Sequence, residues 1–265
     1  MKVYDTIVYI GRFQPVHNAH IAIIKRALDL ANRVVVIMGS ANKPRTYRNP
    51  FTSKEREQML MEELTASRIG KVDRFAPGKN VFIEHVTDSI YNDQAWAMRV
   101  QAIVSQYTKF DKNIAIIGHE KDESSFYLKM FPQWKREEVE LIEPLNATDI
   151  RDLYFRKDAN PNFLNGVVPP AVAAFLARFR SLDEYQTIIK ERLFIENYKK
   201  QFESLPYPVI FVTADAVVMQ SGHVLMIKRK SEPGRGLWAL PGGFVSASKD
   251  KSVKDAMLRE LREET

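Results

Sequence analysis

The chain has no cysteine among its 265 residues. This absence excludes disulfide bonds, a thiolate nucleophile and zinc sites with cysteine ligands. Apolar runs long enough to cross a bilayer are also missing, because the longest candidate, VVPPAVAAFLARF, is short and interrupted by prolines. The first residues, MKVYDTIVYIG, lack a signal-peptide pattern, because the charged Asp5 follows soon after Lys2, before any apolar run. We therefore expect a cytoplasmic protein without a membrane role.

A concentrated basic arm is absent as well. The formal net charge is +6, but Lys and Arg are spread along the whole chain, and there is no nucleic-acid recognition motif, internal repeat or low-complexity segment. Small phosphorylated substrates suit this charge at least as well as nucleic acid does. We expect small-molecule partners and no nucleic acid, and a homo-oligomer stays open because no spacing bears on it.

Strand and helix patterns alternate from residue 6 to about residue 150, which is typical of a parallel sheet with crossover helices. The TSKE string at residues 52–55 predicts a capping box ahead of a helix, so GSANKPRTYRNP is expected to be a loop after the second strand. Ligands of open parallel sheets bind at that edge. The pattern therefore predicts an α/β, Rossmann-like domain with the expected strands TIVYIG, RVVVIMG, NVFIEHV, NIAIIG and EVELIEPL.

The pattern changes after Pro169–Pro170 to helix, first AVAAFLARF and then a long charged segment that stops before Pro206. Two strand-like runs follow, joined by the turn residues Ser221–Gly222, and the chain ends in a helical pattern. We expect a first domain over residues 1–182, a helical connector over 183–206 and a second domain over 207–265.

The stretch GRFQPVHNAH at residues 11–20 lies between an apolar strand and a helix. A glycine at the end of a strand lets the backbone approach a ligand, and a helix N-terminus favours an anion such as phosphate. His17 and His20 are three apart, so in a helical first turn they share a face and both can donate to phosphate oxygens, while Arg12 adds a cation. The stretch indicates phosphate binding.

Simpler interpretations exist for these strings. An HxxH pair alone is more typical of surface polar residues or of half a metal site, and no third ligand follows at useful spacing. The later string NATDIR, residues 146–151, is also typical of a helix N-cap, because Asn and Thr cap helices and Asp suits a first turn. Both interpretations of NATDIR can hold together, since a capped helix start with an arginine one turn in is also a phosphate site.

GRFQPVHNAH resembles the GxFxPxHxGH signature of the nucleotidylyltransferase superfamily, and the arginine after the first glycine resembles its archaeal-type nicotinamide mononucleotide adenylyltransferases. Ala19 stands where the family has Gly. GSANKPRTYRNPFTSKER and GHEKDESSFYLKMFPQW resemble further blocks of the family in the same order. LNATDIRDLYF resembles its ISxTxIR motif, with Asn146 in place of Ser.

The resemblance implies a Rossmann-like enzyme that transfers AMP from ATP to nicotinamide mononucleotide, giving NAD⁺ and pyrophosphate, with Mg²⁺ bridging the triphosphate. It implies three groups of site residues. The catalytic group is His17, His20, Arg12 and Arg151, the ATP and phosphate group is Gly11, Phe13, Thr148, Arg48 and Lys121, and the mononucleotide group is Asn92 and Trp96. A buried structural role is an equal alternative for Trp96.

The final segment, LPGGFVSASKDKSVKDAMLRELREET, resembles the Nudix box, G-x5-E-x7-R-E-U-x-E-E-x-G-U. Glu260, Glu263 and Glu264 fall on one helix face, where three carboxylates repel unless a divalent cation such as Mg²⁺ lies between them. An ordinary charged helix face is the alternative. Lys249 stands where the pattern has Glu, the spacing to Arg259 is two residues longer, and the string ends before the final glycine. The resemblance implies a partial Nudix α/β/α domain over residues 207–265. In its complete form, such a domain would hydrolyse ADP-ribose.

Two rival functions stay open. The first domain could transfer a nucleotide to another phosphorylated acceptor, such as nicotinic acid mononucleotide or a pantetheine phosphate, and only the YNDQAW segment bears on that choice. The C-terminal part could instead sense ADP-ribose or NAD⁺ without cleaving it.

Overall fold

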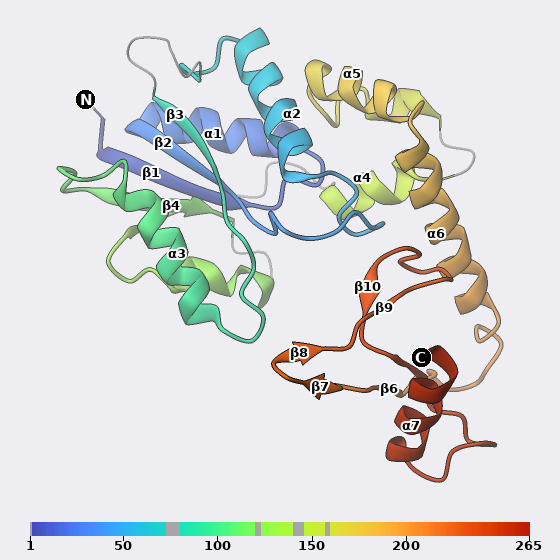
Figure 1. Cartoon of the computed structure of the whole chain (residues 1–265). Coiled ribbons are helices and arrows are strands. Elements are labelled where there is room, and N and C mark those ends of the chain that lie inside the picture. Colours follow the sequence, from blue (N-terminus) through green and yellow to red (C-terminus); the bar gives the residue numbers. More distant parts are fainter. Residues whose placement is uncertain (1, 73–79, 120–122, 140–145, 157–159) are drawn as a thin grey trace. The chain divides into compact units, whose positions relative to one another are not determined.

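A computed structural model describes residues 2–72, 80–119, 123–139, 146–156 and 160–265. The chain forms two compact units, Met1–Gln186 and Thr187–Thr265 (Figure 1). Within the described residues, no helix is both long enough and apolar enough to span a membrane.

The first unit is built on a five-stranded parallel sheet with the strand order β3-β2-β1-β4-β5. This confirms the expected Rossmann-like class. The strands are β1 (Tyr4–Gly11), β2 (Ala31–Met38), β3 (Val81–His85), β4 (Ile114–Gly118) and β5 (Lys135–Glu138).

The fifth strand lies earlier in the chain than expected. The prediction placed it on EVELIEPL, but β5 ends at Glu138, and residues 140–145 fall outside the described residues. β5 is an edge strand that pairs only with β4, and its side chains Lys-Arg-Glu-Glu are largely exposed. An edge strand of this kind carries no apolar run, so periodicity cannot reveal it.

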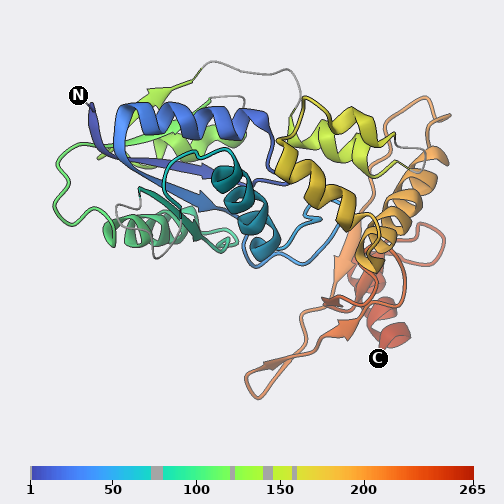
Figure 2. The same cartoon turned by 90° about the horizontal axis from the view of Figure 1, so that it is seen from above.

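Helices α1 (Asn18–Leu30) and α3 (Asp93–Ser105) cover opposite faces of the sheet (Figures 1 and 2). Val8 and Ile10 of β1 join the apolar core on the α3 side. Because side chains alternate along a strand, Tyr9 points to the other face, where its ring contacts those of Phe13 and His20. The carboxyl end of β1 therefore lies between two packed layers, which fixes the position of the loop that follows it.

The loop after β2 ends at helix α2 (Ser53–Ala66), which starts with the predicted capping box. The Glu55 N–H donates to Thr52 Oγ1 at 3.3 Å, and the Thr52 N–H donates to the Glu55 carboxylate at 2.7 Å. Helix α2 packs against α5 (Pro170–Phe179), and the Ala171 N–H at the start of α5 donates to the buried Glu63 carboxylate at 3.3 Å. The unit also contains η1 (Glu123–Lys129), α4 (Ala147–Tyr154) and η2 (Pro161–Leu164).

The second unit combines short antiparallel strand pairs with helix α7 (Val253–Glu264). The predicted hairpin is confirmed, because Ser221 and Gly222 both have positive φ, 48° and 76°, as a two-residue hairpin turn requires. Most of helix α6 (Asp183–Lys200) belongs to this unit, where Tyr198 stacks on Phe244 with ring centroids 5.9 Å apart. The strands are β6 (Thr213–Asp215), β7 (Met219–Gln220), β8 (His223–Val224), β9 (Ile227–Lys228), β10 (Trp238–Ala239) and β11 (Gly242–Phe244).

Candidate active site

The site begins where β1 ends. A Cβ on Gly11 would lie 3.0 Å from the Phe13 ring, so glycine is needed for this close approach. Phe13 itself has a positive φ of 51° and is fully buried, with its ring 4.5 Å from that of His20. The two residues turn the chain sharply and leave the backbone of this loop, not the Phe13 side chain, to face a ligand.

The two histidines are stacked with ring centroids 3.7 Å apart. His17 directly precedes α1 and His20 lies in its first turn, so the two are not both in the helix as expected. The His17 N–H donates to His20 Nδ1 at 3.1 Å, which places the proton of a neutral His20 on Nε2. His17 Nδ1 is buried and has no hydrogen-bond partner among the described residues.

Burial decides the charge of this pair. It lowers the pKa of His17 to about 4, and burial together with the neighbouring His17 lowers the pKa of His20 well below its ordinary value. Both rings are therefore neutral at pH 7. Each then carries one N–H that can be donated to an oxygen of a bound anion.

The NATDIR string starts helix α4, and the predicted cap is confirmed. The Asn146 side chain accepts from the Thr148 N–H at 2.9 Å and the Asp149 N–H at 3.2 Å. One turn later, the buried Arg151 donates to Thr148 Oγ1 at 3.0 Å and to the Gln14 carbonyl at 2.7 Å. The second of these bonds joins the two motifs, which are 137 residues apart in sequence.

Arginines gather around this junction. Arg12 donates to the Arg48 carbonyl at 3.0 Å and to the Asn49 side chain at 2.6 Å, which holds the β1 and β2 loops together. Burial lowers the pKa of Arg151, and the nearby charge of Arg12 lowers it further. The Arg151 Nε is buried without a hydrogen-bond partner among the described residues. Two arginines whose charges repel each other, one of them with a buried N–H that lacks a partner among the described residues, form a favourable binding site for a polyanion.

Arg56, which the sequence analysis did not single out, donates hydrogen bonds to the backbone of the loops that follow β1 and β2. It is 1% exposed, and its guanidinium donates to the carbonyls of Arg12 at 2.6 Å, Gly39 at 2.8 Å and Ser40 at 3.3 Å. The main-chain ladder between β1 and β2 ends with the bond from the Gly39 N–H to the Gly11 carbonyl. Beyond this bond, the Arg56 side chain joins the ends of the two strands in place of main-chain hydrogen bonds. Burial lowers the pKa of Arg56 to about 10.

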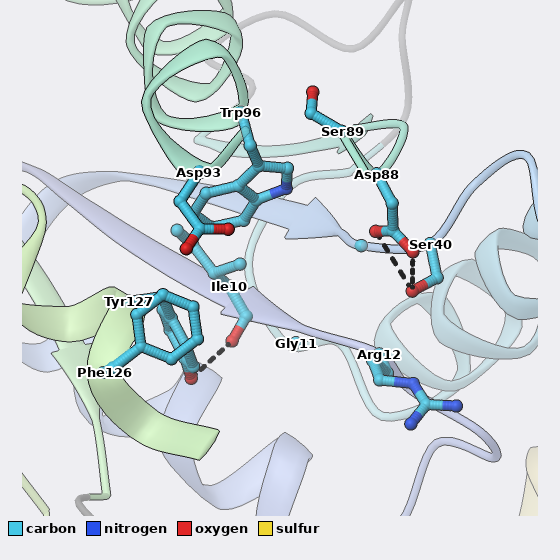
Figure 3. A pocket seen from close by; sticks show the side chains of 11 residues that line it. Ile10, Gly11, Arg12, Ser40, Asp88, Ser89, Asp93, Trp96, Phe126 and Tyr127 are labelled. Carbon is cyan, nitrogen blue, oxygen red and sulfur yellow. Dashed lines mark hydrogen bonds between the residues drawn. The ribbon is translucent and has the colours of Figure 1, made fainter. Parts of the chain in front are cut away.

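A cavity of about 510 Å³ opens beside Gly11 and Arg12 (Figure 3). Trp96 lines it, whereas the Asn92 side chain is not part of the wall and caps α3 by accepting from the Ala95 N–H at 2.9 Å. Lys121 lies outside the described residues. The residues that line the cavity are Ile10, Gly11, Arg12, Gly39, Ser40, Asp88, Ser89, Asp93, Trp96, Phe126 and Tyr127.

Several lining residues were missed in the sequence, although a signal for two of them was present. Ser40 and Asp88 follow the carboxyl ends of β2 and β3, the edge at which parallel sheets bind ligands. Ser40 Oγ donates to the Asp88 carboxylate at 3.0 Å, and Lys43 Nζ lies 3.6 Å from it. Asp88 is thus held and partly neutralised by the β2 loop.

The carboxylates of α7 are engaged by the protein itself. Arg259 pairs with Glu260 at 2.7 Å and with Glu263 at 3.3 Å, while the Glu264 carboxylate accepts from the Gly242 N–H at 2.9 Å. In the described part of the chain, no group of three His, Asp or Glu side chains is arranged to hold a metal ion. In this arrangement the three glutamates do not fit a divalent cation.

The carboxylate that the Nudix pattern requires is present one residue later than expected. Arg259 forms a bidentate pair with Asp250, with both nitrogen-to-oxygen distances at 2.9 Å. The hydrogen bonds from Arg259, with a further one from the Ser246 N–H, lower the pKa of Asp250 to about 2. The neighbouring Lys249 therefore does not leave Arg259 without a carboxylate partner.

Comparison with known proteins agrees with this geometry. Residues 8–153, more than half of the chain, match the family model described as cytidylyltransferase-like. The chain belongs to the cytidylyltransferase-like family. A separate model, the NUDIX domain, matches residues 210–265 of this cytidylyltransferase-like protein.

Individual relatives extend the match. The nicotinamide/nicotinic acid mononucleotide adenylyltransferase of Acinetobacter baylyi is 33% identical over 189 residues, which cover 71% of this chain and 93% of the relative. The bifunctional NMN adenylyltransferase/ADP ribose pyrophosphatase of Francisella tularensis is 34% identical, with a TM-score of 0.84 over 98% of this chain and 73% of that one. A second structure from that organism, in complex with AMP and a Mn ion, has 32% identity and a TM-score of 0.82, with the same coverage.

Proposed function

We propose that the first unit transfers AMP from ATP to nicotinamide mononucleotide, forming NAD⁺ and pyrophosphate. One observation carries the proposal: the loop after β1 leads to two stacked, neutral histidines, is bonded to Arg151 through the Gln14 carbonyl, and lines a cavity that contains an aromatic ring. The relatives named above support the choice of reaction.

The reaction needs positioning more than proton transfer. A phosphate oxygen of the mononucleotide forms a bond to the α-phosphorus of ATP, and the bond from that phosphorus to the bridging oxygen of pyrophosphate breaks. The attacking oxygen is already anionic, so no general base and no covalent enzyme intermediate are required. Mg²⁺ enters with ATP as part of the substrate.

Each side chain then has a separate task. The Nε2–H of His20 and the N–H of neutral His17 donate to the α-phosphoryl oxygens as charge develops on them. Arg151 holds the departing pyrophosphate, with Thr148 orienting its guanidinium, and Arg12 binds phosphate from the cavity side. Trp96 offers its face to the nicotinamide ring.

The test is pyrophosphate release from MgATP with and without nicotinamide mononucleotide, with NAD⁺ followed by chromatography. We expect release that depends on the acceptor and matches NAD⁺, and His20→Ala should lower kcat by about a hundredfold or more, as loss of a transition-state donor does. His223→Ala is the matched control, because His223 is exposed in the β8 hairpin of the second unit. Unchanged turnover in His20→Ala would remove His20 from the mechanism.

For the second unit we propose ADP-ribose hydrolysis, supported by the NUDIX match and the Francisella relatives. One observation favours the alternative of a binding module, because Arg259 engages Glu260 and Glu263. Calorimetry with ADP-ribose, alongside a hydrolysis assay with added Mg²⁺ or Mn²⁺, separates the two. Release of AMP supports hydrolysis, whereas binding without release supports the binding module.

A further inference from the structure

The two ends of the 510 Å³ cavity differ in charge and polarity. At one end the rings of Trp96, Phe126 and Tyr127 surround Ile10, and at the other lie Arg12, Ser40 and Asp88 (Figure 3). If the function proposed above holds, the phosphate of the acceptor points to the Arg12 end, next to the histidines. The pyridine ring then lies at the aromatic end.

Asp93 stands at the aromatic end. It opens α3, and Trp96 follows three residues later, so both side chains leave the same side of the helix (Figure 3). The cap formed by Asn92 and the Ala95 N–H fixes where the helix begins and thereby the direction of both side chains. The Asp93 carboxylate is thus held beside the indole face on which the pyridine ring would stack.

The two aspartates of the cavity differ in their partners. The Asp88 carboxylate accepts from Ser40 at 3.0 Å and lies 3.6 Å from the Lys43 ammonium. The Asp93 side chain has no hydrogen bond or ion pair with any described residue. Its negative charge is therefore available to the ligand, whereas that of Asp88 is taken up by the β2 loop.

We propose that Asp93 sets the choice of acceptor, selecting a mononucleotide whose cationic ring carries a neutral amide over one whose ring carries a carboxylate. The pyridinium ring of nicotinamide mononucleotide is attracted to the Asp93 carboxylate. The extra carboxylate of nicotinic acid mononucleotide is repelled, since like charges repel more strongly in a half-enclosed cavity than in bulk water. Both mononucleotides carry this cationic ring, so the attraction does not discriminate between them, and the specificity comes from the repulsion of the extra carboxylate.

Other described groups do not offset this repulsion. Arg12 is the one cation among the described residues that line the cavity, and it lies at the phosphate end, tied to the Arg48 carbonyl and the Asn49 side chain. Lys43 is engaged by Asp88. A second carboxylate at the Trp96 end would therefore meet Asp93 without a compensating arginine or lysine from the described wall.

The experiment compares kcat/KM for the two mononucleotides at saturating MgATP in the wild type and in variants of Asp93. The wild type should prefer nicotinamide mononucleotide, Asp93→Asn should reduce the preference about tenfold, and Asp93→Lys should reverse it. Asp93→Glu keeps the charge and should keep the preference. Asp29→Asn is the matched control, because Asp29 is an exposed aspartate at the far end of α1.

A ratio of kcat/KM values separates specificity from stability, since general damage to α3 would lower both activities together. An unchanged ratio in both Asp93→Asn and Asp93→Lys, or a wild type that prefers the acid, overturns the inference while the proposed function stands. No product from either acceptor in the wild type overturns the proposed function, and the inference with it.

Discussion

Replacing Arg56 by methionine should destabilise the first unit strongly. The side chain is 1% exposed and donates to four main-chain carbonyls, of which those of Arg12 and Gly39 accept at 2.6 Å and 2.8 Å. Methionine fills most of the volume but removes the side-chain donors of the Arg12 and Gly39 carbonyls. Each short, charge-assisted bond is worth about 1.5–3 kcal/mol, and relief from burying the cation offsets part of the loss. We expect a net loss of about 3 kcal/mol in the free energy of unfolding.

For a unit of this size, such a loss corresponds to a fall in Tm of about 6–12 °C. Circular dichroism melts, read together with residual adenylyl transfer after heating, identify the transition of the first unit. Arg56→Lys should lie between wild type and Arg56→Met, because an ammonium keeps the charge but cannot reach three carbonyls with a planar fork. At permissive temperature the KM for MgATP should also rise in both variants, since Arg12 loses its backbone support.

The matched control is Arg99→Met on α3. Arg99 is exposed, and its guanidinium donates to Thr87 Oγ1 at 3.1 Å. Its removal should change stability by less than about 0.5 kcal/mol. A Tm for Arg56→Met within 2 °C of wild type, with the control unchanged, would refute the idea that Arg56 holds the two strand ends together.

Two further predictions concern pH and the second unit. Burial holds the pKa of His17 at about 4, below its ordinary value of 6.5, so the unfolded chain takes up the proton first as pH falls. Stability that is present above pH 6.5 should therefore be lost between about pH 6.5 and 4, by about 3 kcal/mol. A free energy of unfolding in urea that stays constant over that range would contradict this. Asp250→Asn should destabilise the second unit, which would appear as faster amide hydrogen exchange in α7. In the wild type, the stability that this carboxylate contributes should be present above about pH 4 and disappear towards pH 2. Unchanged exchange in the variant would show that the pair with Arg259 is dispensable.

The sequence predicted best those features that depend on local chemistry. The capping box at Thr52 and the Ser221–Gly222 turn need only neighbouring residues, and both appear in the structure as expected. The patterns of the inner strands β1, β2 and β4 were found because these strands are largely buried, and that of the edge strand β3 because it begins with Val-Phe-Ile. The other edge strand, β5, was misplaced because its exposed side chains form no apolar pattern.

Long-range contacts were harder to predict. Nothing in the sequence near Arg56 or Asp93 shows that one supports the strand ends and the other lines the cavity, because both roles depend on segments far away in the chain. The Nudix pattern places Lys249 where it has Glu, whereas Asp250, one residue later, makes the pair with Arg259, because a spacing along the chain does not specify which side chain reaches the arginine. The resemblance to a family pointed to the loop that we propose binds phosphate, whereas the tautomer of His20 follows from the bond that its Nδ1 accepts from the His17 N–H, which the sequence does not show.

The cluster of Arg12 and Arg151 has a consequence for the lifetime of the protein. Without a bound anion, the charge of Arg12 acts against that of Arg151, and the Arg151 Nε has no partner among the described residues. This region of the fold therefore gains most when a triphosphate binds. A ligand that binds only the folded state adds about 2.7 kcal/mol at a concentration one hundred times its Kd. By this reasoning nucleotide supply governs how long the enzyme survives as well as how fast it works, and depletion of ATP would expose it to unfolding and proteolysis.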